Sequence, residues 1–374
     1  MTHRRRRRHR ELLSPNGLTS ALHHLERRRR NRYYELLSKF AYAVKRNHTK
    51  NATYLAPIPP TAAAYLERNK VVSHTSLTAA WLTYTELYSS TCKLVMKQTT
   101  VKKGVRMDHL VKFCKGLKVW EGHGKRDNLA DVKMLLLVQN EIGQIVGRRL
   151  TSSENKEETM QLLSDVQPQL ETNGECKYLI TDNARAVRDF VASVYGDSVI
   201  VQQDPFHVHQ RFGKHIKAKP LRKFICKEIK AALYDVDREP RPPKEMEAKL
   251  REVLRKITAN DLGCTLAKWN NTIEYNVAQI KAGHLHVAEN TYQEGSGPAV
   301  RVVSPSQLEG FHSALKKLLA REVRAELGLR ILDVFIVQHN IDVGARFGRN
   351  PAISNVDMIS ACRAATVCTL YGVD

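Results

Sequence analysis

Residues 177–207 read KYLITDNARAVRDFVASVYGDSVIVQQDPFH, and this stretch decides the fold. It starts with an apolar run rich in strand formers at 177–181 and has a second, β-branched run at 198–201. Between them, apolar residues recur at three- and four-residue steps, which predicts an amphipathic helix. An acid follows each run, Asp182 and then Asp204. Because reactive groups in open α/β sheets lie beyond the carboxyl ends of strands, the stretch predicts a β-α-β unit with both acids placed for chemistry.

Three further strands are expected before this unit. Residues 105–113 alternate between apolar and polar around Asp108, 132–138 form a buried apolar run, and 144–150 return after a turn as a hairpin. A helix is expected over 155–170. The fold class is therefore α/β, with a mixed five-stranded sheet and flanking helices, which is the element order of the ribonuclease-H-like fold.

The remainder of the chain has mostly helical patterns. Helices are expected over 18–44, over 61–96, for about a hundred residues after His207, and in two segments after 306, the first to about 326. The expected divisions are a basic disordered arm (1–15), a helical N-terminal region with possible DNA binding (16–98), a first part of the catalytic core (99–209), an all-helical insertion (210–300), the final core helices (301–345) and a C-terminal tail (346–374).

The charge is strongly positive and unevenly spread. The formal net charge is +22, and residues 1–50 hold 15 Lys and Arg against 3 acids. Such a charge favours polyanions, nucleic acid first and acidic membrane surfaces second. No apolar run approaches the roughly 20 residues of a membrane span, so we expect no membrane partner. The seven cysteines form no C-x-x-C pair, which favours a reducing compartment and argues against a zinc finger.

Clustered basic residues are the candidate DNA contacts. The first ten residues can be a solvated tail, a nuclear localisation signal or an arm that grips phosphates. A second cluster lies on the helix expected over 18–44, and a third follows the fifth strand. The candidates are Arg4, Arg5, Arg6, Arg7, Arg8, Arg27, Arg28, Arg29, Arg30, Arg211 and Lys214.

Three acids far apart in the sequence are the candidate catalytic residues. Asp108 lies in the first strand, Asp182 at the end of the fourth, and Glu309 on a helix after the fifth. In a ribonuclease-H-like sheet the first and fourth strands are central neighbours, so Asp108 and Asp182 are expected side by side, with Glu309 brought in by its helix. Converging carboxylates suit two Mg²⁺ or Mn²⁺ ions, and such a pair supports phosphodiester chemistry.

Each acid also has a purely structural interpretation. Asp108 can be an exposed residue on an edge strand. Asp182 precedes a helix, where Asp is a common N-cap. Glu309 follows Ser306 by three residues, which is the spacing of a capping box.

A second group of side chains follows the fifth strand. Asp204 and His207 can support the acids, with His207 bonding a carboxylate or a phosphate, or they can be a helix cap and a buried histidine. His312 lies one turn after Glu309 and is a third supporting candidate. Glu309, His312, His207 and His209 together can instead be a transition-metal site, although no zinc-motif spacing supports it.

Five segments carry a resemblance to a known family. They are VRMDHLVKFCKGL, LLLVQNEIGQIVGRRLTSS, YLITDNARAVRDFV, QDPFHVHQRF and SPSQLEGFHSALKKLL. Over about residues 100–345 the chain resembles DDE transposases of the ribonuclease-H-like superfamily, including Mutator-like elements, whose class has a (C/D)-x-x-H signature and an all-helical insertion. Here the signature corresponds to Asp204-x-x-His207. The acids are 74 and then 127 residues apart.

The resemblance implies an enzyme that cuts DNA and joins it to a target. Asp108, Asp182 and Glu309 would be its catalytic and metal-binding triad, with magnesium as the metal. Its partners would be terminal inverted repeats, target DNA and a second copy or larger assembly, in the nucleus of a eukaryote or otherwise in the cytoplasm. The zinc module that relatives carry near the N-terminus is not visible here. The alternatives are a domesticated or truncated DNA-binding protein without catalysis, and a ribonuclease-H-like nuclease.

Overall fold

The computed structural model describes residues 17–120, 126–172, 176–287, 289–303, 307–318, 322–352 and 372. The chain divides into two compact units, Met1–Thr85 and Glu86–Asp374. Among the described residues, no helix combines the length and the apolar character needed to cross a membrane.

The first unit is helical. From residue 17 on, its helices are α2 (Gly17–Lys50), α3 (Ala62–Arg68) and α4 (His74–Tyr84). The helix predicted over 18–44 is confirmed, and α2 extends six residues beyond it. The segment after α2 runs back along it, because the Tyr33 hydroxyl donates to the carbonyl of Pro60 at 3.0 Å and Arg29 donates to the carbonyl of Asn69.

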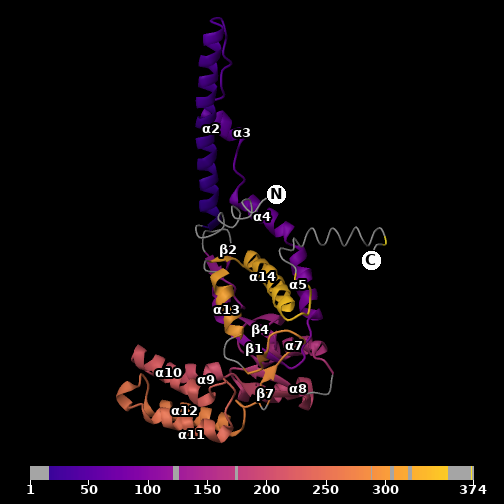
Figure 1. Ribbon diagram of the computed structural model, residues 1–374, viewed down its shortest axis with the longest axis vertical. Coiled ribbons are helices and arrows are strands. Elements are labelled where there is room, and N and C mark those ends of the chain that lie inside the picture. The colour runs from indigo at the N-terminus through magenta and orange to yellow at the C-terminus, as the bar shows by residue number, and fades with distance from the viewer. Residues whose placement is uncertain are drawn as a thin grey trace. The chain divides into compact units, whose positions relative to one another are not determined.

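A mixed five-stranded sheet forms the centre of the second unit (Figure 1). Its strands are β1 (Gly104–Leu110), β4 (Met134–Asn140), β5 (Ile145–Thr151), β6 (Lys177–Thr181) and β7 (Val199–Gln203). They lie in the order β5-β4-β1-β6-β7. β4 is antiparallel to both β1 and β5, whereas β1, β6 and β7 are parallel. The mixed sheet expected from the sequence is therefore present, and the strand of Asp108 pairs with the strand that precedes Asp182.

Helices cover both faces of this sheet. They are α5 (Leu87–Gln98), α6 (Val111–Lys115), α7 (Lys156–Val166), α8 (Ala184–Tyr195), α13 (Gln307–Leu318) and α14 (Ala325–Arg346). Val105 and Met107 of β1 share one apolar cluster with α7 and α8. Leu110 packs in another cluster with α5, α13 and α14. Because side chains alternate along a strand, Asp108 lies on the same face as Leu110, under α13.

A helical region follows β7. It contains α9 (Pro205–Gly213), α10 (Lys219–Leu233), α11 (Pro243–Arg255) and α12 (Leu266–Lys281), and Figure 1 shows it beyond the edge of the sheet. Its buried residues form a separate apolar cluster that includes Phe212, Ile225, Leu250 and Trp269. The helical pattern predicted after His207 is confirmed as far as Lys281, where α12 ends, short of the 300 expected for the all-helical insertion. Within the described residues, three short 3₁₀ helices add to these elements: η1 (Gln167–Gln169), η2 (Gly196–Ser198) and η3 (Ala259–Asp261).

Some predicted boundaries are wrong. The strand expected over 105–113 ends at Leu110, because Phe113 and its neighbour Cys114 are both buried against one apolar cluster, and consecutive residues of a strand face opposite sides. The helix expected from 306 to about 326 ends at Leu318, and a short strand precedes α14. Helix α5, assigned from the sequence to the N-terminal region, belongs to the second unit, where Ser89 donates to Asp333 of α14 at 2.9 Å.

Two small sheets were not predicted. The first consists of β2 (Leu117–Trp120), β3 (Arg126–Asn128) and β10 (Val323–Arg324), and β10 falls in the segment expected to be helical to about 326. The second pairs β8 (Thr291–Tyr292) with β9 (Val300–Arg301), and β8 falls within the insertion expected to be all-helical over 210–300. Strands of two to four residues carry too little alternation to be read from a sequence.

Candidate active site

Asp108 and Asp182 lie side by side at the carboxyl ends of two neighbouring parallel strands. The register of β1 on β6 pairs Met107 with Thr181, so the next position in each chain holds an aspartate. Neighbouring strands lie about 4.8 Å apart. The main chains of the two aspartates are therefore neighbours at this edge of the sheet. The alternative that Asp108 lies on an edge strand is wrong, because β1 is the central strand of the five.

Helix α13 reaches the carboxylate of Asp108. Oδ2 of Asp108 lies 3.6 Å from Nδ1 of His312, and Oδ1 of Asp108 accepts a hydrogen bond from the main-chain N of His109 at 2.7 Å. His312 is buried, and α13 is anchored beside it by Phe311 and Leu315 in the apolar cluster. Glu309 lies on this helix one turn before His312, although its side chain and Ser306 are outside the described residues.

The main chain of Asp182 is held by two side chains. Its carbonyl accepts from Nε2 of Gln203 at 2.6 Å and from the guanidinium of Arg211. Helix α8 begins at Ala184, with Asn183 at the N-cap position. The structural interpretation of Asp182 as an N-cap is therefore wrong. Within the described residues, its carboxylate has one hydrogen bond, from the hydroxyl of Thr181 at 3.4 Å.

Asp204 has a structural role. It is the N-cap of α9, and its Oδ1 accepts from the main-chain N of Phe206 at 2.8 Å. Its Oδ2 lies 3.8 Å from Nε2 of His207, which is longer than a hydrogen bond. The cap interpretation of Asp204 is confirmed, and the signature Asp204-x-x-His207 spans the first turn of this helix.

Three histidines surround the two aspartates. Burial, and then the neighbouring His207, lower the pKa of His312 to about 4. Burial lowers the pKa of His109 against the opposing effect of Glu154 and Asp182. Burial also lowers the pKa of His207; Asp182 opposes this shift, and Arg211 adds to it. All three rings are therefore neutral at neutral pH, and they do not offset the negative charge of the aspartates.

The donor set at this site is oxygen-rich. Among the described side chains, which do not include that of Glu309, no three His, Cys, Asp or Glu are close enough together to hold a metal ion. The transition-metal interpretation gains no support, and the ring of His209 packs edge-on against Phe206 at 5.0 Å. Asp108 and Asp182 supply hard carboxylate oxygens, so the pair fits a magnesium-type cation once one further oxygen ligand joins it.

The candidate DNA contacts are only in part within the described residues. Arg4, Arg5, Arg6, Arg7 and Arg8 lie outside them. Arg27, Arg28 and Arg30 are exposed along α2, whereas Arg29 is half-buried at its contact with the carbonyl of Asn69. Arg211 and Lys214 lie at the end of α9, where Arg211 contacts Asp182.

Sequence patterns did not identify several residues of the site. Gln203 is fully buried, and its amide donates to the carbonyl of Asp182. The indication of this role in the sequence is that Gln203 directly precedes Asp204. Tyr275 of α12 donates its hydroxyl to Oδ1 of Asn183 at 3.3 Å, and the guanidinium of Arg211 lies 4.9 Å from the centre of its ring. Nothing local in the sequence connects α12 with Asp182, since 93 residues separate Tyr275 from it.

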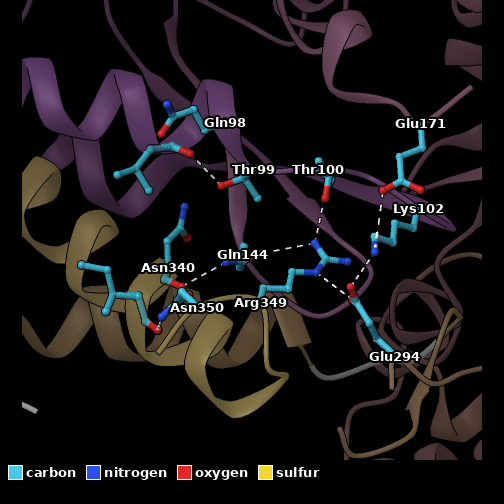
Figure 2. Close-up of a pocket in the computed structure, with 12 residues that line it drawn as sticks. Gln98, Thr99, Thr100, Lys102, Gln144, Glu171, Glu294, Asn340, Arg349 and Asn350 are labelled. Atoms are coloured by element: carbon cyan, nitrogen blue, oxygen red, sulfur yellow. Dashed lines mark hydrogen bonds and ion pairs between the residues drawn. The ribbon is translucent and has the colours of Figure 1, made fainter. Parts of the chain in front are cut away.

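The opposite end of β1 carries a dense network of paired charges. Glu141 is buried, and its Oε2 accepts from the main-chain N of Lys102 and Lys103 at 3.2 Å and of Gly104 at 3.3 Å. Arg349 binds Glu141 at 2.5 Å and Glu294 at 2.7 Å. Figure 2 shows the pocket of about 610 Å³ that this network lines, with Arg349 at its centre. Its charges are paired with one another.

Comparisons with known proteins identify no family for this chain. No protein-family model matches the chain, and no curated protein matches it.

Proposed function

We propose that the protein is a DDE-type transposase, which cleaves DNA and transfers its strands in a metal-dependent reaction. The observation that carries the proposal is the position of Asp108 and Asp182. They occupy adjacent register positions on β1 and directly after β6, and α13 brings His312 to Asp108. Glu309 lies one turn earlier on the same helix. In α/β folds, reactive groups lie at the carboxyl ends of strands, and here this edge of the sheet carries two acids.

The topology of the sheet supports the proposal. The mixed five-stranded sheet has the strand order β5-β4-β1-β6-β7, in which β1 and β6 are central neighbours. This supports the proposal, because a ribonuclease-H-like sheet would set the strands of the first two acids side by side. The helical region from α9 to α12 lies between the second and third acids, as in the transposase class. Fold alone does not determine function, so the proposal depends on the acids.

Asp108, Asp182 and Glu309 would hold the metal, as two Mg²⁺ or Mn²⁺ ions. Held by these residues, the metal would supply Lewis-acid chemistry for phosphodiester cleavage and transfer. Gln203 and Arg211 fix the main chain of Asp182, so its carboxylate keeps one position relative to Asp108. The neutral imidazole of His312 packs against Asp108 without cancelling its charge.

DNA is the proposed substrate. The net charge of +22 attracts a polyanion, and the exposed Arg27, Arg28 and Arg30 can contact phosphates from α2. In this proposal the partners are terminal inverted repeats, target DNA and a second copy of the chain. The nucleus is the expected compartment in a eukaryote.

A nicking assay on supercoiled plasmid with Mg²⁺ or Mn²⁺ tests the proposal. Asp108→Asn, Asp182→Asn and Glu309→Gln should each lower the rate at least about 100-fold, because a lost metal ligand removes several kcal/mol of transition-state stabilisation. Asp165→Asn is the matched control, since Asp165 is exposed on α7 and should leave the rate unchanged. Full nicking by all three variants would overturn the proposal.

Two further readouts separate the steps. Mn²⁺ should raise the melting temperature of the wild type but not of Asp182→Asn, because a ligand that binds only the folded state stabilises it. Joined products with a second plasmid distinguish a transposase from a nuclease of the same fold.

Binding of DNA without catalysis is the second candidate function. The exposed arginines of α2 favour it, because they lie in a unit that contains none of the three acids. Tight DNA binding by the wild type with no nicking under either metal would support this function and contradict the first.

A further inference from the structure

A second pocket lies beside the candidate active site, between α9 and α12. Its volume is about 290 Å³. Arg211, Lys214 and His215 line it from the end of α9, and Lys268, Asn271 and Tyr275 line it from α12. No acidic side chain lines it within the described residues, so the charged groups around it are all cationic.

Two of the cations that line this pocket are lysines at the surface. Lys214 and Lys268 are exposed, and neither has an ion pair among the side chains the structure describes. Burial, then Lys268 and Lys214, lower the pKa of His215, so its ring experiences their positive field. An unpaired cationic pocket attracts an anion.

Arg211 joins this pocket to the acid at the end of β6. It donates to the carbonyl of Asp182 and to Oδ1 of Asn276, the latter at 3.4 Å. Its guanidinium also lies over Tyr275, whose hydroxyl binds Asn183, the neighbour of Asp182. Arg211 and Tyr275, which line the pocket, therefore also hold the segment of Asp182 and Asn183.

We propose that the α9–α12 pocket binds the phosphodiester next to the one that reacts at Asp108 and Asp182. Lys214 and Lys268 contact its phosphate oxygens, and a base of the same strand packs against Tyr275. The inference rests on the proposed function, since it assigns the neighbouring phosphodiester to the two aspartates.

The chemistry of the pocket favours nucleic acid over an acidic protein. A half-buried tyrosine backed by a guanidinium is a surface on which a base can stack, and stacking on an aromatic ring is worth about 1–3 kcal/mol per base in single-strand binding. The asparagine amide of Asn271 adds a donor and an acceptor that a base edge can use. An acidic peptide would use the lysines but not these groups.

Fluorescence anisotropy with the full chain and a labelled single-stranded oligonucleotide tests the pocket. The measurement is made in EDTA, so that catalysis plays no part. Lys214→Gln combined with Lys268→Gln should weaken binding about tenfold and lower the slope of log affinity against log salt by about 0.7, since the loss of one phosphate contact on a single strand removes about 0.7. An unchanged affinity and slope would overturn the proposal.

The matched control removes the same charge elsewhere in the helical region. Lys249 and Lys256 are partly exposed and already lie near Glu245 at 3.9 Å and Glu228 at 3.6 Å. Lys249→Gln combined with Lys256→Gln should change binding less than about twofold, since screened surface charges at a distance contribute little. An equal loss of affinity in both double variants would show a general effect of charge and would overturn the proposal that this pocket binds the phosphodiester.

Photocrosslinking gives an independent readout of Tyr275. An oligonucleotide with 5-iodouracil should crosslink to Tyr275 in the wild type, and Tyr275→Leu should lose that product. Crosslinks found only on other segments would contradict the proposal, as would competition by polyglutamate as strong as that by DNA.

The two proposals can fail separately. Nicking by the wild type together with normal binding by the Lys214/Lys268 variant would refute the pocket alone. Weakened binding by that variant, with no nicking by the wild type under any metal, would refute the catalytic function and leave the pocket as a nucleic-acid site.

Discussion

The acidic side chains at the two ends of the parallel strands β1 and β6 have opposite surroundings. At the amino end, Glu141 is buried among three main-chain N–H donors and the guanidinium of Arg349. At the carboxyl end, Asp108 and Asp182 lie beside one another with neutral histidines around them. The amino end holds one buried carboxylate among several donors, whereas the carboxyl end sets two aspartates next to each other in the register of the sheet.

This difference indicates which end stabilises the fold and which performs chemistry. A buried carboxylate with several donors holds its segments together, because removing one partner leaves the other charge buried and unpaired. Neighbouring carboxylates repel each other and weaken the fold unless a cation binds them. Proteins retain such destabilising arrangements at functional sites, where the residues serve activity and not the stability of the fold.

The largest effect on stability is expected at the amino end. Glu141→Gln should lower the free energy of unfolding by about 3–5 kcal/mol, because Arg349 would lose its most buried partner while Glu294 remains. Urea denaturation of the full chain measures this. Glu171→Gln is the control at the rim of the same network, where the carboxylate lies 3.7 Å from Lys102 and is partly exposed, and it should cost less than about 0.5 kcal/mol. Equal losses in the two variants would contradict the role given to the amino end.

The second effect concerns acid, and it is expected to arise near the carboxyl end. His209 is buried on α9, and burial lowers its pKa from 6.5 to about 4 in the folded chain. The unfolded chain therefore binds the proton first, so stability is full above about pH 6.5 and falls as the pH drops towards 4. We expect a loss of roughly 2 kcal/mol over this window, because water screens part of the ring.

His209→Gln should remove its own share of the acid dependence and leave the share of His312, whose pKa burial also lowers to about 4. His24→Gln, a change at an exposed position of α2, should leave the acid dependence intact. The measurement is urea denaturation at several pH values between neutral and the acidic limit. An identical pH profile for the wild type and His209→Gln would assign the acid sensitivity to other groups.

The existence of the strands that position the site was easier to predict from the sequence than the residues at which they end. The apolar runs before Asp182 and Asp204 were long enough to identify β6 and β7, and each strand ends within one residue of its acid. Asp108 was placed in a strand that was expected to continue past Leu110. The turn into α6 was missed, because Phe113 and Cys114 are adjacent apolar residues whose burial depends on helices distant in the sequence.

The contacts of the site were less predictable than its acids. Asp182 and Asp204 were both interpreted as possible caps, and only Asp204 caps a helix. Gln203 and Tyr275 were not identified, because a glutamine or a tyrosine carries no signal until the fold places it beside Asp182. Sequence patterns predict secondary structure from local periodicity, whereas hydrogen bonds between distant segments require the tertiary structure.

The smallest stability effect is expected for the acid with the largest proposed role in catalysis. Asp182→Asn keeps the main-chain carbonyl that Gln203 and Arg211 bind, and it removes only the charge of a side chain whose hydrogen bond from Thr181 is long. The free energy of unfolding should therefore change by no more than about 1 kcal/mol, and relief of repulsion with Asp108 favours a gain. Urea denaturation without metal measures it. A loss above about 3 kcal/mol would mean that this carboxylate stabilises the fold as Glu141 does, and the contrast between the two ends of the sheet would not hold.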